Sequence, residues 1–216
     1  MKYTILILLV ALIAGCNNLK KEKVQKEEIS SYNYEYEKVK NYFSPQCFFS
    51  HFPTTLNSPF FYKIITDDMA ISYSYVLTVY NCNSDSLKHL SEILRKTCIK
   101  SYLSTDSTML IIKNGYSYQK VKTSIMEGQI LVPFFYKDII SSEKNDFLDF
   151  FSLKTPTGLS SNFEMFIIES KSVYNSTELE KTNIFGKLPR GHNKVYSRGI
   201  CINLKSKYAI YWTIFF

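Results

Sequence analysis

The sequence predicts an α+β domain with a mixed or mostly antiparallel sheet and one main packed helix. Three patterns in the 216 residues carry this prediction. Residues 69–80 alternate apolar and more polar side chains, as a strand with one buried face does. Residues 85–102 carry an apolar stripe at helical spacing. Two strand-like runs, 195–204 and 208–216, flank the polar turn 205–207, which predicts a final hairpin.

The domain is expected to begin at Tyr32 and to continue without a further boundary, so 32–216 is one unit. Tyr36, Val39 and Phe43 fit one face of a short helix that ends before Pro45, whereas alternating Tyr32, Tyr34 and Tyr36 fit a strand equally well. Three prolines then make residues 44–59 a predicted loop region.

The predicted helix at 85–102 has signals at both ends. Its apolar stripe consists of Leu87, Leu90, Leu94 and Cys98. Its candidate N-caps are Asn83, Ser84 and Asp85. Lys96 and Lys100 near the other end suit the negative pole of the helix dipole. These features predict a helix that packs one side on the sheet.

The second half of the domain is expected to consist mainly of strands. Asn114-Gly115 separates the strand-like runs 107–113 and 116–125, which predicts a tight hairpin. Pro133 lies inside the run 129–136 and predicts an edge strand. The remaining expected elements are a short helix at 145–151, a strand at 163–174 and a loop at 187–193.

The first residues have the layout of an exported precursor. Lys2 precedes an apolar run of eleven residues that ends before Cys16 and is too short for a permanent membrane span. The stretch Ile13-Ala14-Gly15-Cys16 resembles the lipobox of bacterial lipoproteins. The resemblance implies cleavage between Gly15 and Cys16 and lipidation of Cys16. The alternatives are an uncleaved N-terminal anchor and a signal cut elsewhere.

This layout divides the chain into a signal peptide at 1–15, a lipidated Cys with a charged tether at 16–31, and the domain. The tether would reach roughly 50 Å when fully extended. As a flexible coil it would span nearer 20 Å. We therefore expect the domain to stay close to a membrane of the bacterial cell envelope, the outer membrane if the cell is Gram-negative, and to lie in the periplasm or at the cell surface.

The charge balance is mildly basic, with 26 Lys and Arg against 19 Asp and Glu and a net charge of +7. The basic residues are spread from Lys20 to Lys207 without a clustered tract, so we expect no nucleic-acid partner. The expected partners are the membrane, through the lipid, and another envelope protein or a cell-wall or glycan polymer. The 17 Tyr and 16 Phe suit core and cross-strand packing, or alternatively a stacking surface for such a partner.

The cysteines other than Cys16 are Cys47, Cys82, Cys98 and Cys201. Four cysteines in an exported chain allow two disulfides in three connectivities, although free buried thiols are the simpler alternative. A helix running from residue 85 would carry Cys98 roughly 20 Å away from Cys82. A disulfide needs Cα atoms within about 7 Å, so we expect these two not to pair.

The sequence contains only weak patterns for a catalytic or metal-binding site. His51 follows Cys47 by four residues, which suits two metal ligands on one helical turn, but the flanking Pro45 and Pro53 limit a helix there. His89 is expected on the solvated side of its helix, and His192 in a polar loop. We therefore expect no catalytic constellation, no metal and no organic cofactor.

The function expected from these observations is a lipid-anchored envelope protein of a non-catalytic binding or assembly type. The alternatives are an envelope hydrolase whose site is assembled from distant residues, and a lipoprotein of the toxin-immunity type. A polar cleft with clustered carboxylates would favour the hydrolase. An exposed aromatic sheet face would favour binding.

Overall fold

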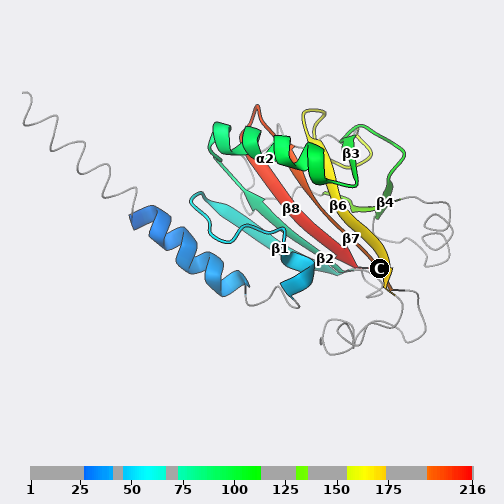
Figure 1. Ribbon diagram of the computed structural model, residues 1–216. Coiled ribbons are helices and arrows are strands. Elements are labelled where there is room, and N and C mark those ends of the chain that lie inside the picture. The colour runs from blue at the N-terminus through cyan, green and yellow to red at the C-terminus, as the bar shows by residue number, and fades with distance from the viewer. Residues whose placement is uncertain are drawn as a thin grey trace, which may run out of the picture.

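The computed structural model describes residues 27–40, 46–66, 73–112, 130–135, 155–173 and 194–215. Within these residues, two helices pack against a six-stranded sheet (Figure 1). The strands are β1 (Phe60–Thr66), β2 (Tyr73–Val79), β3 (Lys100–Leu103), β6 (Glu164–Val173), β7 (Lys194–Asn203) and β8 (Tyr208–Phe215). Their order is β1-β2-β8-β7-β6-β3, and every neighbouring pair is antiparallel. This confirms the predicted α+β class.

The predicted final hairpin is present as β7 and β8. Its turn is closed by Asn203, whose Oδ1 accepts a hydrogen bond from the Ser206 amide at 3.1 Å. Lys207 adopts a positive φ of 62°, which lets the chain reverse. All eight residues of β8 are buried, on both faces of the sheet. β8 is therefore a central strand covered on both sides.

Helix α2 (Ser84–Thr97) follows β2 and confirms most of the predicted helix. Asn83 caps it, because its side chain accepts hydrogen bonds from the amides of Asp85 and Ser86. Leu87 and Leu94 of the apolar stripe are buried against the sheet.

The predicted extension of this helix to residue 102 is wrong. Cys98 has extended backbone angles, and the chain turns at once into β3, which pairs with β6. Cys98 fits the helical stripe by spacing alone. The main-chain hydrogen bonds that β6 offers determine the local structure instead, as the 2.8 Å bond from the Ile99 amide to the Ile167 carbonyl shows.

Other strands differ from expectation in extent or partner. β1 has no counterpart among the predicted elements, and it pairs with β2 along its whole length. The run expected at 107–113 forms only β4 (Leu110–Ile112), outside the main sheet. β4 pairs in parallel with β5 (Leu131–Pro133), so Pro133 lies in a small two-stranded sheet, consistent with its expected edge position.

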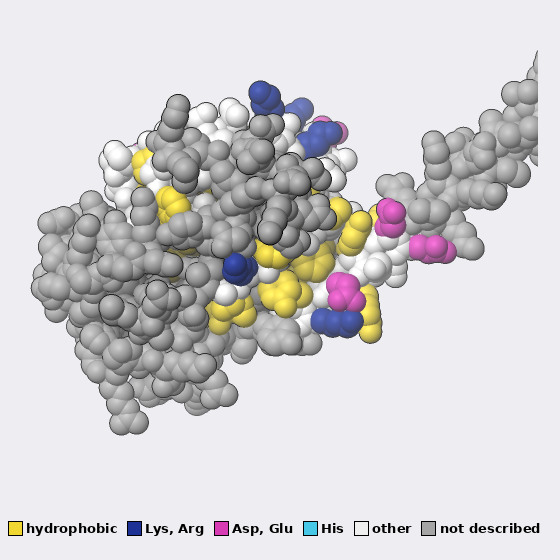
Figure 2. All heavy atoms as spheres, turned by 180° about the vertical axis from the view of Figure 1, so that it is seen from behind, with side chains coloured by type: hydrophobic (Ala, Val, Ile, Leu, Met, Phe, Trp, Pro, Cys, Tyr) yellow, Lys and Arg dark blue, Asp and Glu magenta, His cyan; other side chains and the backbone are white. Residues whose placement is uncertain are grey.

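The two faces of the main sheet carry separate cores. One face, which we call the helical face, packs against both helices and the loop after residue 45; Tyr211 and Phe215 of β8 lie on it. The other face packs against the small sheet and its neighbouring loops, and Ile210 and Trp212 lie there. Viewed from behind, hydrophobic side chains gather between scattered Lys, Arg, Asp and Glu side chains (Figure 2). Neither described helix has the length and apolar content needed to cross a bilayer.

The first described element is a helix at 27–40, called the N-terminal helix below. Its described part includes residues 27–31 of the segment expected to be a tether, and residues 27, 28, 30 and 31 are exposed. Tyr36 and Val39 are buried on the sheet, which resolves the two interpretations of this stretch in favour of a helix. Several expectations fall outside the described residues: the signal segment with Gly15 and Cys16, the strand 116–125 with the turn Asn114-Gly115, the helix 145–151, and the loop 187–193 with His192.

Candidate functional site

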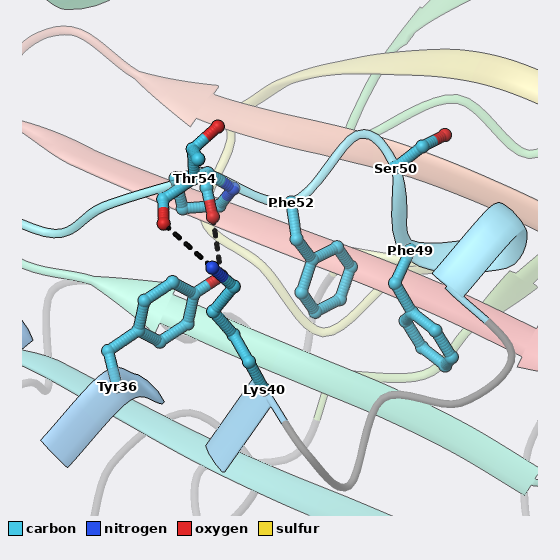
Figure 3. Close-up of a pocket in the computed structure, with 7 residues that line it drawn as sticks. Tyr36, Lys40, Phe49, Ser50, Phe52 and Thr54 are labelled. Atoms are coloured by element: carbon cyan, nitrogen blue, oxygen red, sulfur yellow. Dashed lines mark hydrogen bonds between the residues drawn. The ribbon is translucent and has the colours of Figure 1, made fainter. Parts of the chain in front are cut away.

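A cavity of about 270 Å³ lies between the N-terminal helix and the loop that follows the 3-10 helix η1 (Gln46–Phe49) (Figure 3). Both elements contribute aromatic rings to it, and the helix adds one ammonium group. The lining residues are Tyr36, Lys40, Phe49, Ser50, Phe52, Pro53 and Thr54. These seven residues include one cation and no carboxylate, so the cavity combines apolar walls with a single positive charge.

The helical wall is held in place by hydrogen bonds to the loop. Tyr36 and Lys40 lie four residues apart, so they project from the same side of the helix. The Tyr36 hydroxyl donates to the Pro53 carbonyl at 2.8 Å, and Lys40 Nζ donates to the Thr54 carbonyl at 2.9 Å (Figure 3). Burial, with the nearby Tyr211 and Glu37, raises the pKa of Tyr36, so its hydroxyl stays a donor. These bonds fix the width of the cavity.

The loop wall is an aromatic layer. Phe49 and Phe52 point to the same side of the loop, and Ser50 points away from them (Figure 3). Their ring centroids are 5.4 Å apart in an edge-to-face contact, and Phe49 also meets Tyr75 of β2 at 5.0 Å. Phe49 and Phe52 are buried, so the loop is anchored by its own rings before any ligand enters.

A polar cluster lies beneath the same loop. Arg198 of β7 donates to the Ser50 hydroxyl at 2.9 Å and forms an ion pair with Glu169 of β6 at 2.8 Å. Lys171 also pairs with Glu169. Burial acts to raise the pKa of Glu169, but hydrogen bonds from Lys171 and Tyr196 and the charge of Arg198 lower it below its ordinary value. Glu169 is therefore a carboxylate that ties the loop to the sheet through Arg198.

His51, the metal-ligand candidate of the sequence, also anchors this loop. Its Nε2 lies 3.0 Å from the Trp212 carbonyl and must carry a proton to donate to it. Burial lowers the pKa of His51 to about 3, and Arg198 adds to that effect. The imidazole is therefore neutral, and its buried Nδ1 has no hydrogen-bond partner among the described atoms.

The remaining sequence candidates that the structure describes do not line the cavity. His89 is exposed on α2, as expected, and the side chain of Cys47 lies outside the described part. Cys82, Cys98 and Cys201 are free thiols, so Cys82 and Cys98 are unpaired as predicted. Burial raises the pKa of Cys82 to about 11. Among the described residues, no three His, Cys, Asp or Glu side chains lie close enough together to hold a metal ion.

Lys40, Phe49 and Phe52 line the cavity but are not among the site residues predicted from the sequence. A signal was present, because Phe48, Phe49 and Phe52 form an aromatic group inside a proline-rich loop. Such rings in a loop must be buried against another element, and here the N-terminal helix provides Tyr36.

No family model matches the chain, and no curated protein or solved structure matches it.

Proposed function

We propose that this chain is a lipid-anchored binding protein of the bacterial cell envelope, without catalysis of its own. Its domain would bind a ligand or partner through the cavity between the N-terminal helix and the loop 49–54. The observation that carries this proposal is the cavity itself, whose walls are fixed by hydrogen bonds and ring contacts. Preorganised apolar cavities with a few polar groups are the usual form of a ligand site.

The position of the cavity supports a role near a membrane. Residues 17–26 separate the proposed lipid at Cys16 from the N-terminal helix, and fully extended they reach about 35 Å. The helix itself adds about 20 Å. Lys40, the last described residue of this helix, lines the cavity, so a ligand bound there would be held within roughly 55 Å of the membrane surface.

The character of the cavity favours binding over hydrolysis. A hydrolase needs a nucleophile or a water-activating base directed at the substrate. The lining here provides aromatic rings, hydroxyls, carbonyls and one ammonium group. His51, which lies in the same loop, uses Nε2 to hold the Trp212 carbonyl. An exposed aromatic sheet face would also have favoured binding. The central strand β8 does not provide one, because its residues are buried on both faces of the sheet.

Two measurements test the proposal. Intact-mass analysis of the mature protein should show a diacylglycerol on Cys16, and an unmodified Cys16 would remove the membrane assignment. The mature full-length protein should then be assayed against ester, peptide and glycoside panels. Turnover that disappears when a single Ser, Cys, His, Asp or Glu is replaced would establish the hydrolase instead.

A further inference from the structure

The cavity has the chemistry to recognise a small carboxylate with an apolar body. We infer that it binds such an acid, with the apolar body against Phe49 and Phe52 and the carboxylate on Lys40. This inference rests on the proposed function, because it specifies the ligand of the same cavity. The size of the cavity fits such a ligand. Its volume of about 270 Å³ is just below the volumes of pockets that hold drug-sized ligands, and it suits a group as large as one aromatic ring.

Lys40 has a donor left for such a ligand. An ammonium group has three N–H donors. Two of them are used, toward the Glu37 carboxylate at 3.0 Å and the Thr54 carbonyl at 2.9 Å. The ammonium group also lies 5.7 Å from the centroid of the Tyr36 ring, a contact that an entering carboxylate does not have to replace. The Lys40 side chain is 31% exposed, so it lies at the rim of the cavity, where an entering carboxylate can reach it.

Glu37 is a competitor that a ligand can displace. Its side chain is 60% exposed, and exposed ion pairs contribute little to stability. A ligand carboxylate beside the aromatic walls would be shielded from water, which strengthens its hydrogen bond to Lys40. Removing the charge of Glu37 should therefore increase the affinity for an acid, whereas removing Lys40 should decrease it.

The same helix provides a matched control. Glu35 and Lys38 form a second pair with the same three-residue spacing, 2.9 Å apart, and both are about half exposed. Neither residue lines the cavity. Changes at this pair alter the helix charge equally but leave the cavity untouched, so they separate a local contact from a general electrostatic effect.

The test uses the mature lipid-anchored chain in nanodiscs, with empty nanodiscs as the blank. The probes are N-acetylphenylalanine, its C-terminal amide and 3-phenylpropionate, titrated by calorimetry or ligand-observed NMR. We expect both acids to bind and the amide to bind weakly. Lys40→Met should weaken the acids about ten- to a hundredfold, the range for a hydrogen bond to a charged group. Lys40→Arg should retain binding, and Glu37→Gln should strengthen it.

The two acids also distinguish the sources of such a carboxylate. Tighter binding of N-acetylphenylalanine would indicate the C-terminal residue of a protein or peptide, and tighter binding of 3-phenylpropionate would indicate a free organic acid. Lys38→Met and Glu35→Gln should change neither affinity. Equal binding of acid and amide, or unchanged acid binding in Lys40→Met, would overturn the inference and leave an apolar binding site. Binding of none of the probes would also overturn it, whereas turnover of a substrate would overturn the proposed function itself.

Discussion

Acid should destabilise this fold through His51, and the effect should begin at a pH where most carboxylates are still charged. The structure lowers the pKa of His51 from the ordinary 6.5 to about 3, chiefly by burial. Between pH 6.5 and 3, His51 therefore binds a proton in the unfolded chain but stays neutral in the folded chain. Unfolding becomes progressively more favourable as the pH falls from 6.5 toward 3, and the full stability returns above 6.5.

The size of the effect follows from the shift. Each pH unit within this range changes the free energy of unfolding by about 1.4 kcal/mol for one group. At pH 5 the loss attributable to His51 should be about 2 kcal/mol, and at pH 4 about 3 kcal/mol. Arg198 and Glu169 carry opposite charges near the ring, so Arg198 lowers the pKa of His51 and Glu169 raises it.

Urea unfolding of the wild type and of His51→Gln at pH 7, 5.5 and 4.5 measures this loss. Gln can still donate to the Trp212 carbonyl but cannot titrate, so its stability should fall less steeply with acid. Comparing slopes removes the cost of the substitution itself and the contributions of all other groups. His89→Gln, at an exposed position on α2, should follow the wild type. Parallel profiles for the wild type and His51→Gln would refute the buried, neutral histidine.

Three other changes have definite expected outcomes. Gly199→Ala would place a methyl carbon 2.4 Å from the Phe166 carbonyl oxygen and 2.7 Å from a ring carbon of Trp212. This change should lower the free energy of unfolding by about 3 kcal/mol, which calorimetry would record as a fall in Tm of roughly 6–12 °C. Ser197→Ala, two positions earlier in the same strand, should leave the stability nearly unchanged. Arg95→Ala breaks the α2–β6 pair with Glu164 and should cost less than about 1 kcal/mol in urea unfolding, because the Arg95 side chain is half exposed. Cys16→Ala should either release the protein from the membrane fraction or stall it as the precursor, as cell fractionation with mass analysis would show.

Elements with strong local signals were predictable from the sequence. The β7–β8 hairpin is specified by alternation on both sides of a polar turn, and α2 by Asn83 and the stripe of Leu87 and Leu94. These signals lie within a few residues of the structure they predict. Local chemistry and tertiary packing agree there, so the structure confirms these elements.

Elements that depend on distant partners were not predictable in this way. β3 has only four residues, and its conformation is set by β6, more than sixty positions away. The sheet order places β2 beside β8, which no local pattern encodes. The cavity depends on Tyr36 and Lys40 meeting Phe49 and Phe52, and that meeting follows from how the helix and the loop both pack on the sheet. Periodicity could predict the buried face of the helix, but not its partner.

The position of β8 has a consequence for how the protein reaches its native state. β8 joins β2 to β7, with Tyr73 opposite Phe215 across more than 140 positions of the chain. Until residues 208–215 have been synthesised, the β1–β2 pair has no neighbour to connect it with β6 and β7. Such long-range pairing makes folding slow. For a chain exported as proposed, this delay would keep the precursor open for translocation, and the sheet would close only after the last described strand has crossed.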